Sequence, residues 1–367
     1  MSVYTDLGMK QVINGSGKMT ALGATAVSAS IAEAVGIATR DYVEMDDLLK
    51  ITGEKIATFT GAEGGCPVVC ASAGIAISVA ALIAGKNLSL IEKLPNSQGL
   101  KNEIILQKGH AVHYGGSLPQ MVTLGGGVVV EVGHANKTEP DHIRSAITDQ
   151  TVALMYVKSH HAVQKGMQPL ATMLEIAKAA NLPLIIDAAA EEDFKKYGTC
   201  GADLVLFSGG KALGGPTCAM VCGRKELTDA CQSQYKGIGR AMKAGKESMI
   251  GLIAAMKEYG QNLLSPEEQK EAMQALLEGL AGLPGVKGEI AQDEAGREIY
   301  RARIQFDPTL CGVNATQVAA ALKKGNPAIY TRDHYANVGI LQIDPRPLLP
   351  GQVQQIVKGL KEILIVK

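Results

Sequence analysis

The sequence predicts an α/β fold with a mainly parallel sheet, followed by a smaller α+β domain at the C-terminus. Two observations support this prediction. Short apolar runs alternate with amphipathic helices through the middle of the chain, and the composition changes near Ser265. Such alternation is typical of β-α-β units whose sheet is covered by helices. With 367 residues, the chain has the length of about two domains.

The elements expected in the first domain are short and have buried faces. In chain order they are a helix at 46–60, a strand at 67–71, a helix at 74–85, strands at 102–106, 127–132 and 151–158, a helix at 170–180, and three strands ending near Asp187, Ser208 and Gly223. Several of these strands are almost continuously apolar, as expected when a parallel sheet is covered on both faces.

A charged amphipathic helix opens the smaller domain. Ser265 is its expected N-cap, and Pro266 takes the first helical position. The elements expected after it are a strand at 300–306, a helix at 314–323, a strand at 338–343 and a last helix from residue 350. We therefore expect domains at 1–255 and 256–367.

Composition excludes several classes of protein. Basic and acidic residues both number 36, so the chain is neutral and no nucleic-acid partner is expected. Seven cysteines without a framework spacing favour a reducing, cytoplasmic location, and the first ten residues lack the layout of a signal peptide. The uncharged run 64–85 is rich in small residues and contains Pro67, so we interpret it as a buried strand and helix rather than a membrane span.

Small residues lie where the expected strand at 67–71 meets a helix. Ser72, Ala73 and Gly74 could bind an anion such as a phosphate through free backbone N–H groups and a hydroxyl. Small residues are also common in ordinary strand-to-helix turns, so a structural role is the alternative.

Asp187 ends another buried strand. It needs a cation or several donors there, because an unpaired buried carboxylate is costly. An N-cap or a salt bridge would also satisfy it.

Lys211 stands among glycines in FSGGKALGGP, just after Ser208. Glycines allow the backbone to approach a bulky ligand closely. Desolvation lowers the pKa of a lysine amine and makes it a nucleophile for a carbonyl. We therefore interpret Lys211 as a candidate catalytic residue, with a structural role as the alternative.

Four histidines lie near predicted strand ends: His110, His113, His160 and His161. Adjacent residues point to opposite sides of an extended backbone, so at most one of His160 and His161 faces a site. No metal is expected, because the histidines lack the spacing of a zinc motif. The cysteine pairs 66/70 and 218/222 fall in predicted strands, where the two thiols are too far apart to bind one ion.

ATP binding is not expected either. The segment 14–20 (NGSGKMT) resembles the end of a phosphate-binding loop, but it lacks the first glycine of that motif and the hydroxyl residue after the lysine.

Taken together, a Ser/Gly turn, a strand-ending aspartate and a lysine 24 residues later resemble the fold type I pyridoxal-phosphate enzymes. More narrowly, the chain is similar to the selenocysteine-synthase-like (SelA) family. Four stretches within residues 7–225 carry this similarity: LGMKQVINGSGKMTALGAT, ITGEKIATFTGAEGGCPVVCASAGIAISVAALIAG, GMQPLATMLEIAKAANLPLIIDAAAEED and LVLFSGGKALGGPTCAMVCGRK. The resemblance implies an aspartate-aminotransferase-like fold with pyridoxal 5'-phosphate as cofactor.

The resemblance also implies a role for each matching residue. Lys211 would carry the cofactor as a Schiff base, and Asp187 would keep its pyridine nitrogen protonated. The residues expected to bind the cofactor phosphate are Ser72, Ala73, Gly74 and Ser208. His113 would stack on the pyridine ring, with His110 or Tyr114 as alternatives.

Within this family, the chain is most similar to ammonia-lyases that act on a phosphorylated amino sugar acid. Lys211 would then remove the Cα proton, and His160 or His161 would protonate the leaving hydroxyl group. Arg332 would bind the substrate carboxylate, with Arg346 as the alternative. The candidates for the sugar phosphate are Lys18, Lys236, Arg240 and Lys243, with ordinary surface exposure as the alternative for each.

Three other functions compete with this prediction. Selenium transfer onto seryl-tRNA fits the family, but the chain begins close to the catalytic domain and is neutral. Another reaction of a small amino acid, such as aldol cleavage, racemisation or β-elimination, suits the same scaffold. A cofactor-binding or assembly protein without turnover is the third. For the enzyme readings we expect a homo-oligomer, at least a dimer, because fold type I sites are normally completed by a neighbouring subunit.

Overall fold

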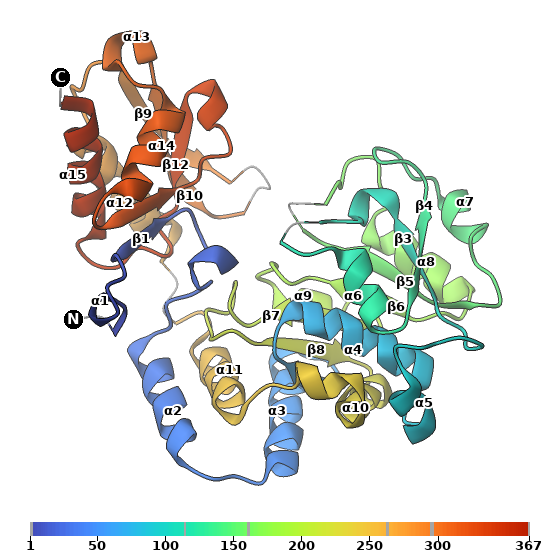
Figure 1. The fold of residues 1–367 in the computed structure, drawn as a ribbon. Coiled ribbons are helices and arrows are strands. Elements are labelled where there is room, and N and C mark those ends of the chain that lie inside the picture. The colour runs from blue at the N-terminus through green and yellow to red at the C-terminus, as the bar shows by residue number, and fades with distance from the viewer. Residues whose placement is uncertain (1–2, 114, 160–161, 262–263, 294–296, 366–367) are drawn as a thin grey trace. The chain divides into compact units, whose positions relative to one another are not determined.

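The computed structural model describes residues 3–113, 115–159, 162–261, 264–293 and 297–365 (Figure 1). The chain forms two compact units: residues 25–259 make the larger, and residues 1–24 and 260–367 together make the smaller. The expected boundary lies close to the observed one at the larger unit's C-terminus. The structure differs at the N-terminus, because strand β1 (Val12–Gly15) pairs in parallel with β11 (Ala328–Thr331) of the smaller unit.

A seven-stranded sheet forms the centre of the larger unit, in the order β2-β8-β7-β6-β5-β3-β4. Its strands are β2 (Gly64–Val68), β3 (Glu103–Gln107), β4 (Val128–Val132), β5 (Thr151–Val157), β6 (Leu184–Asp187), β7 (Leu204–Ser208) and β8 (Ala219–Gly223). Strand β8 is antiparallel to both of its neighbours, whereas the other pairs are parallel. The predicted α/β class with a mainly parallel sheet is confirmed.

Helices cover both faces of this sheet. The longer ones are α2 (Ala29–Arg40), α3 (Met45–Thr60), α4 (Ala71–Ala84), α8 (Leu170–Ala179), α10 (Lys225–Ser233) and α11 (Lys246–Glu258). The shorter ones are α5 (Leu88–Lys93), α6 (Leu118–Leu124), α7 (Pro140–Arg144) and α9 (Phe194–Gly198). Alternate residues of β6 enter two separate cores: Leu184 and Ile186 join the core under α3, α8 and α11, whereas Ile185 joins the core under α4, α6 and α10. Burial on both faces explains why the strands are almost continuously apolar.

Strand β2 begins three residues earlier than expected, because two glycines extend it toward α3. A side chain on Gly65 would place its Cβ 2.6 Å from Cβ of the buried Ile56 and 2.7 Å from the carbonyl oxygen of Gly53. Glycine is rare in strands, so the sequence pattern did not include this segment. Pro67 fits in β2 because this strand lies at the edge of the sheet.

The smaller unit contains the β1–β11 pair and a three-stranded antiparallel sheet in the order β12-β10-β9. Its remaining elements are α1 (Val3–Asp6), α12 (Pro266–Gly279), β9 (Val286–Gln292), β10 (Tyr300–Phe306), α13 (Pro308–Cys311), α14 (Ala315–Lys324), β12 (Ile340–Ile343) and α15 (Gln352–Ile365). Ser265 caps α12 as predicted: its hydroxyl accepts the N–H of Glu268 at 3.2 Å, and the Glu268 carboxylate accepts the N–H of Ser265 at 2.7 Å. Across the described ranges, no helix has the length and hydropathy of a membrane span.

Substitutions at two separate glycines test the packing of β2 on α3. Gly65→Ala should lower the free energy of unfolding by about 2 kcal/mol, because the added methyl group overpacks a buried contact. Gly36 in α2 is the control, since open space surrounds it. Gly36→Ala should raise stability by about 0.5 kcal/mol. Guanidinium unfolding followed by circular dichroism measures both, and equal stability of the two variants would contradict the packing described here.

Candidate active site

The carboxyl ends of β2, β6 and β7 lie at one edge of the large sheet. Strands β6 and β7 are parallel, and β2 and β7 are both antiparallel to β8. The first residue of β8, Ala219, pairs with Val68 on one side and with Ser208 on the other. Asp187 pairs with Leu206, two residues before Ser208. The turn into α4, Asp187 and Ser208 therefore reach the same edge, where open α/β sheets bind ligands.

Asp187 ends β6 in a desolvated position. Its Oδ1 accepts the N–H of Ala189 at 3.0 Å. Burial raises the pKa of Asp187, whereas the hydrogen bond from Ala189 and the positive charge of Lys211 lower it. The N–H of Ala189 is the one hydrogen-bond donor to this carboxylate among the described residues. The carboxylate can therefore accept a further positive donor, such as a protonated ring nitrogen.

Lys211 is held by a tight loop between β7 and β8. The N–H of Gly209 donates to the carbonyl oxygen of Cys218 at 2.9 Å, and the N–H of Gly215 donates to the carbonyl oxygen of Gly209 at 2.8 Å. A side chain on Gly209 would collide with Sγ of Cys218. Thr25 fixes the residue before the lysine, because its hydroxyl donates to the carbonyl oxygen of Gly210 at 2.7 Å. The backbone thus holds the half-buried Lys211 close enough for its charge to act on Asp187.

Ser72, Ala73 and Gly74 lie in the first turn of α4, whose N-cap residue Cys70 makes no side-chain hydrogen bond to the helix. The N–H of Gly74 donates to the carbonyl oxygen of Cys70 at 3.0 Å. The N–H groups of Ser72 and Ala73 come before the helical ladder and are suited to an anion. Gly74 instead permits close packing, since its Cβ would lie 2.7 Å from Cδ2 of Leu206.

The histidines near the strand ends have different environments. His110 is fully buried, its Nδ1 accepts the N–H of Val157 at 3.2 Å, and its ring packs edge-on against Tyr156 at 4.8 Å. Burial lowers the pKa of His110 to about 4. A ring enclosed in this way is a core residue, so the structure does not support His110 as the ring that stacks on a cofactor. His113 is exposed. The other candidates, Tyr114, His160 and His161, lie outside the described residues.

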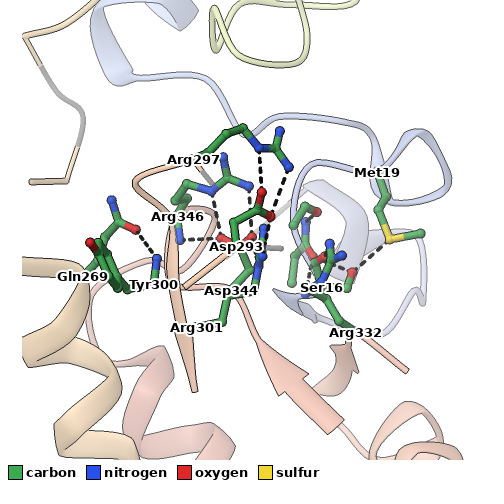
Figure 2. A network of polar contacts seen from close by, with 12 residues as sticks. Ser16, Met19, Gln269, Asp293, Arg297, Tyr300, Arg301, Arg332, Asp344 and Arg346 are labelled. Carbon is green, nitrogen blue, oxygen red and sulfur yellow. Dashed lines mark hydrogen bonds and ion pairs between the residues drawn. The ribbon is translucent and has the colours of Figure 1, made fainter. Parts of the chain in front are cut away.

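The smaller unit carries a separate cluster of charged side chains, drawn in Figure 2: Asp293, Arg297, Arg301, Arg332, Asp344 and Arg346. Asp293 pairs with Arg297 at 2.9 Å and with Arg301 at 2.7 Å. Asp344 pairs with Arg301 at 3.0 Å and with Arg346 at 2.9 Å. Burial alone would raise the pKa of Asp344, but the charges and hydrogen bonds of Arg346 and Arg301 hold it at about 2. Both aspartates are therefore ionised and engaged by arginines.

Arg332 differs from the other three arginines of this cluster. It has no carboxylate partner among the described residues, its Nη1 donates to the carbonyl oxygen of Ser16 at 3.5 Å, and its Nε is buried without a hydrogen-bond partner. Burial and the charge of Arg301 lower its pKa. An incoming anion would relieve both effects. The guanidinium of Arg346 already donates two hydrogen bonds to the Asp344 carboxylate. Arg332 is therefore the better candidate for binding the carboxylate of a substrate. Lys18, the phosphate candidate, follows Ser16 by two residues and is half-buried.

Sequence patterns did not identify Thr25, Arg301 or Asp344 as residues that support these sites. Arg301 and Asp344 are 43 positions apart and meet only because β10 and β12 pair, with Ala302 opposite Ile343. An aspartate directly after the apolar strand ILQI repeats the pattern that singled out Asp187, and this signal could have found Asp344.

Comparisons with known proteins agree with the resemblance found in the sequence. The family model described as L-seryl-tRNA selenium transferase (SelA) matches residues 12–278. A D-glucosaminate-6-phosphate ammonia lyase of Salmonella typhimurium is 42% identical over 99% of this chain and 98% of its own length. A 5'-C-glycyluridine monooxygenase-decarboxylase of a Streptomyces species is also 42% identical, over 99% of this chain and 92% of its own length.

Solved structures give the same result for the fold. A D-glucosaminate-6-phosphate ammonia-lyase structure superposes with a TM-score of 0.95 at 42% identity, covering 100% of this chain and 98% of the other. An aspartate aminotransferase of Thermus thermophilus, 16% identical, has a TM-score of 0.51 over 98% of this chain and 94% of its own. The second likeness concerns the fold alone, and the predicted aspartate-aminotransferase-like fold is confirmed.

Asp187→Asn tests the carboxylate at the end of β6. The variant should still bind pyridoxal phosphate but lose at least about 99% of turnover, because an amide cannot stabilise a protonated ring nitrogen. Asp203→Asn is the matched control: its carboxylate accepts the N–H of Leu184 at the other end of the same strand. Steady-state rates and cofactor content measure the effect. Near-normal turnover in Asp187→Asn would mean that this residue only maintains structure.

Proposed function

Because the chain belongs to the L-seryl-tRNA selenium transferase (SelA) family, we propose that it is a pyridoxal-phosphate-dependent ammonia-lyase. In this proposal it converts D-glucosaminate 6-phosphate to 2-keto-3-deoxy-6-phosphogluconate and ammonia. The observation that carries the proposal is the position of Asp187 at the ligand-binding edge of the sheet, near enough to Lys211 for the charge of this lysine to lower the pKa of the carboxyl group.

The residues at this edge fit pyridoxal 5'-phosphate. The Asp187 carboxylate can accept a further positive donor, the N–H groups of Ser72 and Ala73 suit a phosphate, and Lys211 is half-buried. Ser208 ends β7 beside them and is the further candidate for the phosphate. When bound, this cofactor withdraws electrons from the carbon that carries the substrate amine.

The chain's own residues then share the remaining tasks. Lys211 would hold the cofactor through its Nζ, and the same Nζ would take the proton from Cα of the substrate. Asp187 would hold the proton on the ring nitrogen of the cofactor. The hydroxyl group on C3 leaves with a proton from His160 or His161, so one water molecule departs, and a second is consumed when ammonia is released. His113 would be the residue that packs against the cofactor ring.

The positive groups of the smaller unit are assigned to the substrate. Arg332 binds the carboxylate in this proposal, supported by its buried Nε without a partner. Lys18 is the candidate for the sugar phosphate. A phosphate held at a distance from Cα contributes binding energy that can orient the Cα–H bond for proton removal.

A second candidate function comes from the Streptomyces relative, which is as similar in sequence as the ammonia lyase. A monooxygenase-decarboxylase consumes dioxygen and releases carbon dioxide, whereas the elimination proposed here consumes no dioxygen and releases no carbon dioxide. The two reactions therefore differ in gas exchange. The seryl-tRNA selenium transferases are more distant, at 27% identity for that of Clostridium perfringens, so selenium transfer is the less favoured alternative.

We further propose a homo-oligomer of at least two subunits in the cytoplasm. Several apolar side chains on α2, α3 and their connection are strongly exposed in the single chain: Ile37 at 46%, Tyr42 at 103%, Val43 at 46% and Ile51 at 48%. Apolar surface of this kind favours an interface. All seven cysteines are unpaired, which suits a reducing compartment.

A substrate panel tests the proposed reaction. Ammonia release from D-glucosaminate 6-phosphate should exceed that from D-glucosaminate, D-serine and L-serine by at least about tenfold, because only the first carries the remote phosphate. Lys211→Ala should abolish ammonia release, whereas Lys225→Ala, at an exposed ion pair with Asp229, should not. Faster release from either serine would refute the sugar-phosphate assignment. Dioxygen consumption with 5'-C-glycyluridine would favour the second candidate.

A further inference from the structure

A turn at the end of β1 is closed by the side chain of Asn14. Its Oδ1 accepts hydrogen bonds from both the N–H and the hydroxyl group of Ser16, each at 3.0 Å. Its Nδ2 donates to the carbonyl oxygen of Gly17 at 2.8 Å. One amide side chain thus makes three hydrogen bonds within residues 14–17 and fixes the shape of this turn.

The turn lies against Arg332. Strand register places Gly15 opposite Thr331, so Arg332 follows directly after the last pair of the β1–β11 ladder. The carbonyl oxygen of Ser16 accepts a hydrogen bond from Nη1 of Arg332. Gly17 has a φ of +101°, and a Cβ at this position would lie 3.8 Å from that same Nη1. The backbone of the turn therefore contacts one edge of the Arg332 guanidinium.

Asp344 also contacts the turn but is not paired with Arg332. Its N–H donates to the carbonyl oxygen of Gly15 at 2.7 Å, and its carboxylate is engaged by Arg301 and Arg346. In the described part of the chain, Ser16 supplies the one hydrogen-bond acceptor of the Arg332 side chain. Figure 2 shows Ser16 and Arg332 together on one side of the paired charges.

From this geometry we propose that Asn14 is a positioning residue for Arg332. It fixes the turn that holds one edge of the guanidinium, so that the remaining N–H groups of this planar fork keep one orientation toward the carboxylate of the substrate. The inference rests on the proposed function, since it requires a substrate with a carboxylate. Among the described residues, the side-chain hydrogen bonds of Asn14 all lie within its own turn.

Two ligands that differ only in the carboxylate distinguish the binding of this group from the binding of the rest of the molecule. The first is D-glucosaminate 6-phosphate, and the second is 2-amino-2-deoxy-D-glucitol 6-phosphate, in which a hydroxymethyl group replaces the carboxylate. In the holoenzyme, Asn14→Ala should raise the KM of the acid about tenfold with a change in kcat below about threefold, because a misaligned guanidinium mainly weakens substrate placement. The inhibition constant of the amino alcohol should not change.

Two further variants distinguish positioning from general stability. Asn14→Ser should have a smaller effect than Asn14→Ala, since a hydroxyl can still accept from the N–H of Ser16. Asn314→Ala is the matched control: Asn314 caps α14 in the same unit, accepts the N–H of Gln317 at 2.9 Å, and has no contact with Arg332 among the described residues. It should lower stability without changing the KM of the acid.

An unchanged KM in Asn14→Ala, or an equal loss for the acid and the amino alcohol, would overturn the proposal. If the wild-type enzyme accepts neither ligand, the proposed substrate is wrong, and crystal structures of Asn14→Ala and Asn314→Ala then decide the role of Asn14. Displacement of Arg332 in the first variant alone would support positioning. An undisturbed Arg332 in Asn14→Ala would overturn it.

Discussion

The partial burial of the Asp187 carboxylate at the end of a strand is the constraint on which the site in the larger unit depends. A carboxylate removed from most of its water is stable only if charge or donors reach it. One backbone N–H, that of Ala189 two residues further along the chain, and the charge of Lys211 do so, and the second depends on the parallel pairing of β6 with β7. The loop that carries Lys211 in turn needs Gly209, whose close contact with Cys218 admits no side chain. Sheet register, glycine placement and electrostatics thus support one site.

The sequence predicted the features that depend on local pattern. Apolar runs located the central strands, and Ser265 with Pro266 located the start of α12 to the residue. It did not predict the partner of β1, because a four-residue strand containing Asn and Gly has no periodicity that reveals which unit it joins. Domain assignment of residues 1–24 therefore required the structure.

The residues of the candidate site also fall into those that the sequence predicted and those that only the structure could identify. Asp187 and Lys211 stand out because polar groups at the ends of buried strands are unusual. The choice between Arg332 and Arg346 was open in the sequence, since both follow short apolar strands of the smaller unit. Only the ion pairs distinguish them: Arg346 has a bidentate partner in Asp344, whereas Arg332 has none among the described residues. Such pairing depends on contacts between residues far apart in the chain.

Two relatives of equal identity with different reactions show that the fold does not choose the chemistry. All the candidate enzyme functions require that Lys211 carries the cofactor. Borohydride reduction tests this requirement most directly. Purified protein incubated with pyridoxal phosphate should absorb in the visible region. Reduction followed by digestion and mass spectrometry should place the cofactor on the peptide that contains Lys211. A protein that stays colourless, or a cofactor fixed to another lysine, would contradict the site described here.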